Sequence, residues 1–120
     1  MKVILDTNFI LTCVKQKIDF FEELKFMGIV ILVPRQVVRE VTSLSTNRSK
    51  VGENARFALK LFEENRFEEI DLKNKNVDKG LIQFTEKNSD VLIATLDREL
   101  KKKIINSKIV IREKKRLEVI

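Results

Sequence analysis

The sequence predicts a single three-layer α/β/α domain over residues 1–120, with a central, mostly parallel sheet. Short apolar runs typical of buried strands alternate with segments of helical periodicity, which is the pattern of βαβ units. Hydrophobic residues make up 43% of the 120 positions, enough for one sizeable core. With one proline, three glycines, no internal repeat and no linker, nothing divides the chain. Right-handed crossovers would bring the carboxyl ends of the strands to one edge of the sheet.

The first quarter of the chain predicts a strand, two helices and a second strand. The apolar run Lys2–Leu5 is expected to form the first strand. Apolar residues then recur at helical spacing in Phe9–Val14 and Phe20–Met27, and Asp19 stands where a helix cap is expected. Ile29–Val33 is a continuous run of β-branched and aliphatic residues, which is typical of a strand buried on both faces.

The middle of the chain predicts two helices and a weak strand. Proline suits the first turn of a helix, and valines at helical spacing extend the expected helix over Pro34–Leu44. Residues 45–50 are polar and turn-like, so they are the best candidate for a mobile loop. Ala55–Phe62 has the spacing of an amphipathic helix, and Phe67–Leu72 is expected to form a weak strand.

The last third predicts two helices alternating with two strands. Val77–Lys87 is expected to be helical, with its apolar positions on one side. Val91–Thr95 is expected to form a buried strand, and Asp97–Ile105 a short basic helix. The apolar run Ile109–Ile111 is the last expected strand.

The lack of histidine and the single cysteine limit the chemistry that this chain can perform. The chain has no histidine, which excludes Ser-His-Asp and Cys-His catalysis and histidine-bound zinc or iron. Its single cysteine, Cys13, cannot form an intrachain disulfide, and this fits a reducing cytoplasm. No apolar run reaches the length of a membrane span, and the N-terminus lacks a signal-peptide pattern. Catalysis would have to use carboxylates, lysines, hydroxyls or a metal held by oxygen atoms.

Positive charge is concentrated near the C-terminal end. The formal net charge is +6, and segment 98–116 carries nine Lys/Arg against two acids. Such a segment attracts polyanions, although an ordinary solvated surface explains the composition equally well. All eight aromatic residues are Phe and most occupy apolar positions, so no base-stacking platform is visible.

Two aspartates follow predicted strands directly. Asp6 comes immediately after the first strand and Asp97 two residues after the fourth, so both are expected at the carboxyl edge of the sheet, where open parallel sheets bind ligands. Asp78 begins a helix that can face the same edge, and Glu40 lies near the boundary of a buried helix face. Taken singly, each acid has a structural explanation: a helix cap, a turn or a surface ion pair.

Taken together, the acids indicate a cation site. Clustered carboxylates repel and raise one another's pKa unless a cation neutralises them. Hard oxygen ligands favour Mg²⁺ or Mn²⁺, which can activate water and stabilise phosphoryl displacement. The acidic stretch around residues 63–71 is interpreted instead as a solvated edge.

Four motifs in order carry a resemblance to a known family: VILDTNFIL, PRQVVREVTSL, VDKGLIQFTEKN and VLIATLDRELKKKI, followed by the closing IVIREKKRLEV. Together they resemble the PIN domain family of metal-dependent ribonucleases over nearly the whole chain. The archaeal and eukaryotic branch involved in ribosomal RNA processing is the more similar one, and bacterial toxin-type PIN domains are more distant.

The resemblance implies a four-acid pocket that holds Mg²⁺ or Mn²⁺ and acts in catalysis. The acids that match it are Asp6, Glu40, Asp78 and Asp97. Polar positions that support the pocket are matched by Thr7, Asn8 and Thr95. Close relatives often carry a further acid where this chain has Lys79, which could weaken metal binding or neutralise a phosphate.

Three functions therefore compete. The first is a metal-dependent endoribonuclease, in rRNA processing or RNA turnover, with RNA phosphates held by the basic residues Arg98, Lys101, Lys102 and Lys103. The second is a weak or inactive PIN-fold module that binds RNA or assists assembly, or the toxin of a toxin–antitoxin pair. The third is a small phosphatase, which Asn8 disfavours because that class usually has an aspartate there.

Partners are also expected. The resemblance suggests a homodimer, supported weakly by Phe20, Phe21 and Phe26, which exceed what one helix face needs. A protein partner, either an antitoxin or a ribosome-assembly factor, is left open.

Overall fold

The computed structural model describes residues 1–120 and contains one six-stranded sheet in the order β3-β2-β1-β4-β5-β6. The five strands β1 to β5 run parallel, and β6 is antiparallel to β5. This confirms the predicted α/β/α fold with a mostly parallel sheet. The strands are β1 (Lys2–Leu5), β2 (Val30–Pro34), β3 (Glu68–Ile70), β4 (Leu92–Ala94), β5 (Lys108–Arg112) and β6 (Arg116–Val119).

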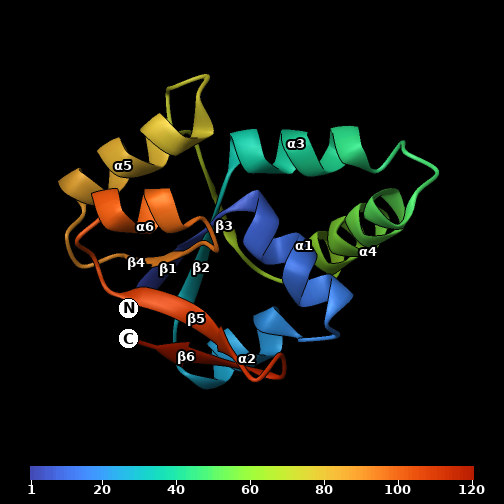
Figure 1. Cartoon of the computed structure of the whole chain (residues 1–120), viewed down its shortest axis with the longest axis horizontal. Helices are drawn as coiled ribbons and strands as arrows, with labels where there is room; N and C mark the ends of the chain where they lie inside the picture. Colours follow the sequence, from blue (N-terminus) through green and yellow to red (C-terminus); the bar gives the residue numbers. More distant parts are fainter.

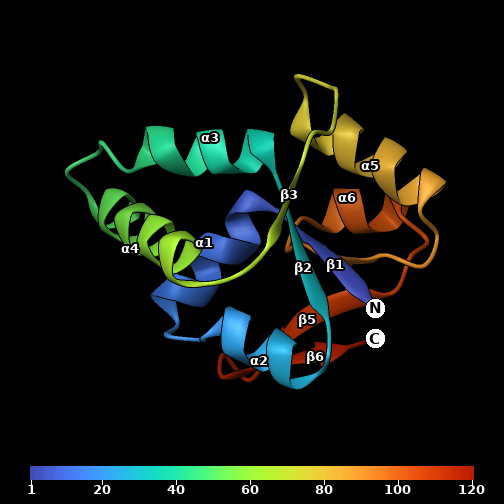
Figure 2. The same ribbon diagram turned by 180° about the vertical axis from the view of Figure 1, so that it is seen from behind.

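Helices cover both faces of the sheet, α1 to α4 on one and α5 and α6 on the other (Figure 1; seen from behind in Figure 2). No helix is both long and apolar enough to cross a bilayer. The helices are α1 (Thr7–Lys15), α2 (Phe20–Phe26), α3 (Arg35–Leu44), α4 (Lys50–Glu64), α5 (Val77–Lys87) and α6 (Arg98–Lys103).

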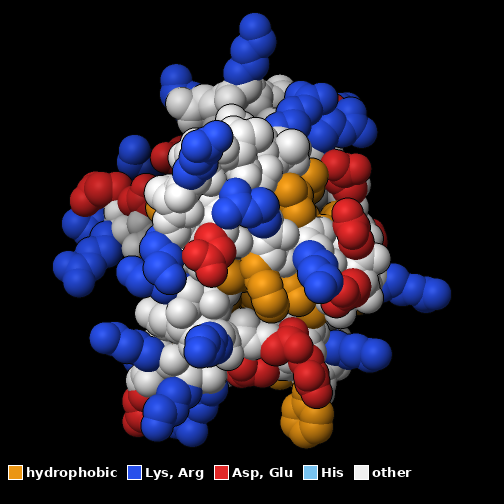
Figure 3. All heavy atoms as spheres, turned by 90° about the vertical axis from the view of Figure 1, so that its right-hand side faces the viewer, with side chains coloured by type: hydrophobic (Ala, Val, Ile, Leu, Met, Phe, Trp, Pro, Cys, Tyr) orange, Lys and Arg blue, Asp and Glu red, His pale blue; other side chains and the backbone are white.

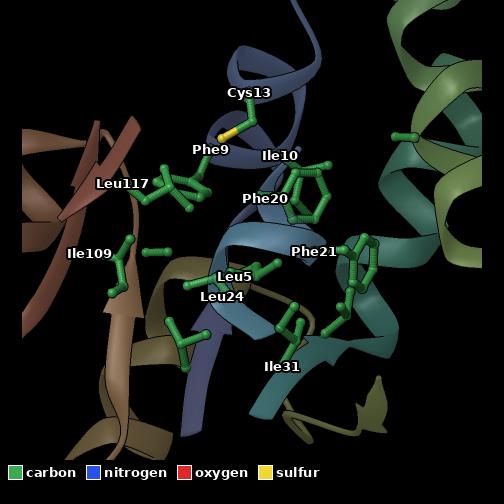
Figure 4. Close-up of a cluster of buried hydrophobic side chains, with 14 of the residues drawn as sticks. Leu5, Phe9, Ile10, Cys13, Phe20, Phe21, Leu24, Ile31, Ile109 and Leu117 are labelled. Carbon is green, nitrogen blue, oxygen red and sulfur yellow. The ribbon is translucent and has the colours of Figure 1, made fainter. Parts of the chain in front are cut away.

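Alternation along the strands produces two cores. Val3 and Leu5 point to the face covered by α1 to α4, where 21 buried residues form the larger core, while Ile4 is one of the 8 buried residues that form the smaller core beneath α5 and α6. Figure 4 shows the larger core, in which side chains from α1 and α2 pack against β1, β2 and β5. Burial on both faces explains why the central strands read as continuous apolar runs.

The sequence missed β6. This strand contributes a single buried side chain, Leu117, so it lacks the apolar run that identified the other strands. The turn before it places Glu113 and Lys114 at positive φ, without the glycine or asparagine that usually marks such a turn. Leu117 N–H donates to the Glu23 carboxylate at 2.9 Å, which ties the strand to α2.

The α3–α4 corner, where a mobile loop was expected, is held by side-chain contacts with its backbone. α4 begins at Lys50, several residues before the expected start, so the turn is short. Arg56 Nη1 donates to the carbonyl oxygens of Ser45 (2.7 Å) and Asn47 (3.0 Å). Gly52 packs so closely against Asn47 that a Cβ there would lie 1.9 Å from the Asn47 carbonyl oxygen.

Candidate active site

The strand order places the first and fourth acids at a switch point. In the sheet, β2 lies on one side of β1 and β4 on the other, so the strand order reverses direction at β1. In open parallel sheets, ligands bind at the carboxyl ends of the strands where the order reverses. Asp6 follows β1 directly, and its N–H donates to the Ala94 carbonyl at the end of β4, at 3.0 Å. Asp97 is the third residue of the connection that follows β4, and the charge of Asp97 acts on Asp6.

Thr95 joins these two acids. Its Oγ1 donates to Asp6 Oδ2 at 2.9 Å and accepts from the Asp97 N–H at 3.2 Å, and the residue is only 1% exposed. The other Asp6 oxygen, Oδ1, accepts from the Thr7 N–H at 2.8 Å, so Asp6 caps α1. Thr95 thus bridges the side chain of Asp6 and the backbone of Asp97, which is the contact that a supporting role would need.

Asp97 is also a helix cap, as its structural explanation predicted. Its Oδ1 accepts from the Glu99 N–H at 2.9 Å and the Leu100 N–H at 3.2 Å. Two backbone donors fix the carboxyl group at the start of α6 and leave its second oxygen without a protein donor. The cap and a pocket role are thus compatible for the same side chain.

Glu40 and Asp78 come from helices on opposite faces of the sheet, α3 and α5. Partial burial raises the pKa of Glu40, and the negative charges of Asp6 and Asp78 raise it further, against a lowering effect of the neighbouring Thr7 hydroxyl. Asp78 lies in the first turn of α5 but does not cap it, because Asn76 Oδ1 accepts from the Lys79 N–H at 3.0 Å.

The acids form one electrostatic unit. Burial raises the pKa of Asp6 above its usual 3.8, the hydrogen bonds from Thr95 and Thr7 oppose this, and the charges of Asp78 and Asp97 add to the rise. All five ion pairs in the structure join other residues. The four acids therefore concentrate negative charge that no lysine or arginine neutralises by direct contact.

The donor set fits a hydrated divalent cation better than a closed protein cage. No three Asp, Glu or Cys side chains lie close enough together to hold a metal ion among them. Mg²⁺ usually keeps several waters and binds through one or two carboxylates, so such a cage is not required. The carboxylate of Asp6, which is buried and makes no ion pair, and its negative neighbours would supply the field that attracts such an ion.

Other expected site residues divide into two groups. Thr7 is buried beside Glu40, and its Oγ1 makes no hydrogen bond of normal geometry, while Asn8 is exposed and makes no side-chain hydrogen bond to the pocket. The basic helix α6 begins at the pocket and runs away from it, so Arg98 is the nearest of the expected RNA-binding residues. In the lysine run 101–103, Lys102 pairs with Glu99 at 3.5 Å.

Sequence reasoning missed Gln36 and Asp71. Gln36 Nε2 donates to Asp71 Oδ1 at 2.8 Å, and Gln36 Oε1 accepts from the Leu72 N–H at 3.2 Å. The only signal in the sequence was the position of Gln36, four residues before Glu40 and so on the same side of the helix. Its partners lie 35 and 36 residues further along the chain, beyond any local pattern.

Two grooves lie elsewhere on the surface, and neither is lined by any of the four acids. One, of about 800 Å³, lies between the end of α1 and α4, and the other, of about 880 Å³, between α2, the start of β2 and the end of α4. On the side of the molecule where α4 lies, Figure 3 shows hydrophobic side chains gathered between charged ones. The chemistry of the acids, and not groove size, identifies the candidate site.

Comparison with known proteins adds independent support. The family model described as "PIN like domain" matches residues 3–116. Ribonuclease VapC4 of Methanocaldococcus jannaschii is 32% identical over an alignment 128 residues long, and this alignment covers 98% of this chain and 95% of that protein. The rRNA-processing protein fcf1 of Schizosaccharomyces pombe is 33% identical over 104 residues, and the match covers 85% of this chain but 52% of that protein.

Solved structures agree on the fold. The structure of the PIN domain endonuclease Utp24 superposes with a TM-score of 0.81 at 29% identity, covering 98% of this chain and 90% of that one. The VapBC2 structure from Rickettsia felis, solved with a DNA fragment, matches with a TM-score of 0.56 at 19% identity and supports the fold alone.

Proposed function

This chain belongs to the PIN-like domain family, and on that premise we propose that it is a metal-dependent endoribonuclease. The substrate is RNA, and the reaction is hydrolysis of a phosphodiester bond at the carboxyl edge of the sheet. The catalytic and metal-binding acids are Asp6, Glu40, Asp78 and Asp97. The names of two relatives suggest two roles for this activity. One is rRNA processing, as in the name of fcf1, and the other is RNA cleavage by a ribonuclease such as VapC4.

One observation carries the proposal: Thr95 links Asp6 to Asp97 at the switch point. A buried carboxylate without a cationic partner is unfavourable unless something neutralises it. The hydrogen bonds from Thr7 and Thr95 hold the Asp6 carboxylate in place, while the nearby acids keep the surroundings negative. This arrangement is unfavourable for the fold alone and becomes favourable when a cation is bound.

A bound Mg²⁺ or Mn²⁺ would supply Lewis acidity and charge neutralisation for phosphodiester hydrolysis. The protein's part is to present and orient carboxylate oxygens: Asp6 through Thr95 and the α1 cap, Asp97 through the α6 cap. Glu40 and Asp78, which approach from the two helical layers, complete the negative field.

RNA phosphates would be held by basic side chains around the pocket. Arg98 lies at the start of α6, next to Asp97, and makes no ion pair in the structure. Lys79 follows Asp78 in the first turn of α5 and is exposed, so it can neutralise a phosphate. The lysine run 101–103 extends this positive surface along α6.

A second candidate function is an RNA-binding or assembly module with little catalytic activity. Lys79 favours it, because a cation beside Asp78 weakens the attraction of the pocket for metal. The two functions differ in one measurement, since both bind RNA and only the first cleaves it.

We propose the cytoplasm as the site of action, because the single cysteine is a free, buried thiol. The argument for a homodimer from Phe20, Phe21 and Phe26 is weaker in the structure than in the sequence. Phe20 and Phe21 are buried in the larger core, so of these three phenylalanines Phe26 alone, at 92% exposure, lies on the surface. An antitoxin or an assembly factor remains a proposal for the protein partner.

The experiment is cleavage of a labelled single-stranded RNA with Mn²⁺, Mg²⁺ or EDTA. The endoribonuclease proposal expects internal cleavage with metal and none with EDTA. RNA binding without cleavage by any metal-loaded sample would favour the second candidate.

A further inference from the structure

The third acid, Asp78, lacks the direct anchoring of the first and fourth. Asp6 and Asp97 are tied to neighbouring parallel strands through Ala94 and Thr95. Asp78 is reached from β3, an edge strand of three residues, through the connection 71–76. Its position relative to Glu40, on the other side of the sheet, depends on what holds this connection.

Gln36 holds the connection with both ends of its side-chain amide. The NH₂ group donates to Asp71 Oδ1 at 2.8 Å, and the carbonyl oxygen accepts from the Leu72 N–H at 3.2 Å. Arg35 adds an ion pair with Asp71 at 3.7 Å. Gln36 lies one helical turn before Glu40, so the helix that presents the second acid also grips the segment leading to the third.

The grip continues to the first turn of α5. Asp71 Oδ1 also accepts from the Lys73 N–H at 2.8 Å, closing a turn in which Lys73 has a φ of 55°. Leu72 is buried against Gly80, where an added Cβ would lie 2.9 Å from Leu72 Cβ. Gly80 is two residues after Asp78, so the contact fixes the turn that carries the third acid.

The end of the connection is fixed as well. Asn74 Oδ1 accepts from the Asn76 N–H at 2.9 Å, and Asn76 in turn caps α5. The hydrogen bonds from Lys73 and Gln36 lower the pKa of Asp71, so its carboxyl group stays ionised and able to accept. A continuous series of short contacts thus runs from α3 to the base of Asp78.

We propose that Gln36 is a positioning residue that sets the separation of Glu40 and Asp78 and thereby the metal affinity of the pocket. The inference rests on the proposed function. Gln36 contacts neither RNA nor metal in this role, and it acts by holding the Asp71–Leu72 backbone. Residues hydrogen-bonded directly to metal ligands change metal affinity by about 10- to 100-fold when they are altered, and Gln36, which acts through the Asp71–Leu72 segment, is expected at the lower end of this range.

The test compares Gln36→Ala with Asn65→Ala. Asn65 also donates one side-chain hydrogen bond of ordinary length, 2.9 Å to the Leu61 carbonyl, but at the end of α4 and without a link to any of the four acids. Mn²⁺ binding is measured by the loss of the free-ion electron paramagnetic resonance signal, and folding by circular dichroism. We expect Gln36→Ala to raise the Kd for Mn²⁺ about 10-fold and Asn65→Ala to leave it unchanged.

Kinetics separate positioning from a merely structural role. Gln36→Ala is expected to lower kcat at a fixed, subsaturating Mn²⁺ concentration with an unchanged KM for RNA. Gln36→Ala combined with Asp71→Ala should bind Mn²⁺ no more weakly than the weaker single variant, because both changes break the same link.

Three results would overturn the inference alone, and a fourth would overturn it together with the proposed function. A folded Gln36→Ala variant with the wild-type Kd for Mn²⁺ would exclude positioning, and so would an equal loss in Asn65→Ala. Additive effects of the Gln36 and Asp71 changes would show that they do not act through one link. A wild-type protein that binds no Mn²⁺ would instead refute the proposed function, and this inference with it.

Discussion

Replacing Asp6 with Asn separates the fold from the metal site. Asn keeps a carbonyl oxygen for the Thr7 N–H, and the Thr95 hydroxyl can rotate to accept from the new NH₂ group. Exchanging a charged acceptor for a neutral one loses roughly 1 kcal/mol. Against this, the variant removes a carboxylate whose pKa is raised by burial and by Asp78 and Asp97.

The sign of the pH dependence follows from that raised pKa. A carboxyl group with a higher pKa in the folded state stabilises the fold fully below its unfolded pKa, which is near 3.8. This contribution is lost as the pH rises through the folded pKa, at about 1.4 kcal/mol for each unit of difference. Without metal, we expect the stability of Asp6→Asn relative to wild type to increase between pH 4 and pH 7.

Metal reverses the comparison. At about 100 times its Kd, a cation that binds only the folded state adds about 2.7 kcal/mol, or roughly 10 °C in Tm for a chain of this size. We expect this shift in wild type and a much smaller one in Asp6→Asn. The assay is thermal unfolding at several pH values, with EDTA or with MnCl₂. Equal Mn²⁺-induced shifts in the two proteins would remove Asp6 from the metal site.

Three further results are expected. Changing the lysine run 101–103 to Ala should weaken RNA binding and lower its salt slope by up to about three counterions, with metal binding unchanged; an unchanged slope would show that α6 does not track phosphates. Gly52→Ala should destabilise the fold by about 2 kcal/mol or more, because the new Cβ meets the Asn47 carbonyl; chemical denaturation measures this, and a loss below 0.5 kcal/mol would contradict the packing. Light scattering at high concentration should give the mass of a homodimer, and a strictly monomeric mass would refute that proposal.

The backbone could be predicted where burial leaves a pattern. Ile29–Val33 reads as a strand because both faces are covered, and the observed β2 lies within one residue of it. β6 could not be predicted, because it lies at the edge of the sheet and buries only one side chain, Leu117. A single buried residue leaves no apolar run or alternation in the sequence. The turn after α3 was predicted from its polar residues, but the start of α4 at Lys50 was not, because the first turn of that helix has no apolar pattern of its own.

The acids that follow strands could be placed near one another from the sequence, and the acids on helices could not. Asp6 and Asp97 follow buried strands, so topology alone places them together. Glu40 and Asp78 sit on helices from different layers, and their association came from the family resemblance, because chain spacing does not fix which way two separate helices face. Gln36 was missed for a related reason: its partners belong to a connection that the sequence does not place beside α3.

Cleavage of RNA by wild type and by Asp97→Asn tests the central claim most directly. Asn is also a good helix cap, so the variant should keep α6 and the fold while losing a charge of the pocket. The account predicts that wild type cleaves a labelled single-stranded RNA with Mn²⁺ and not with EDTA. It predicts that Asp97→Asn binds the same RNA but cleaves it at least about 100-fold more slowly. Equal cleavage by the two proteins, or cleavage by wild type in EDTA, would contradict a metal-dependent carboxylate site.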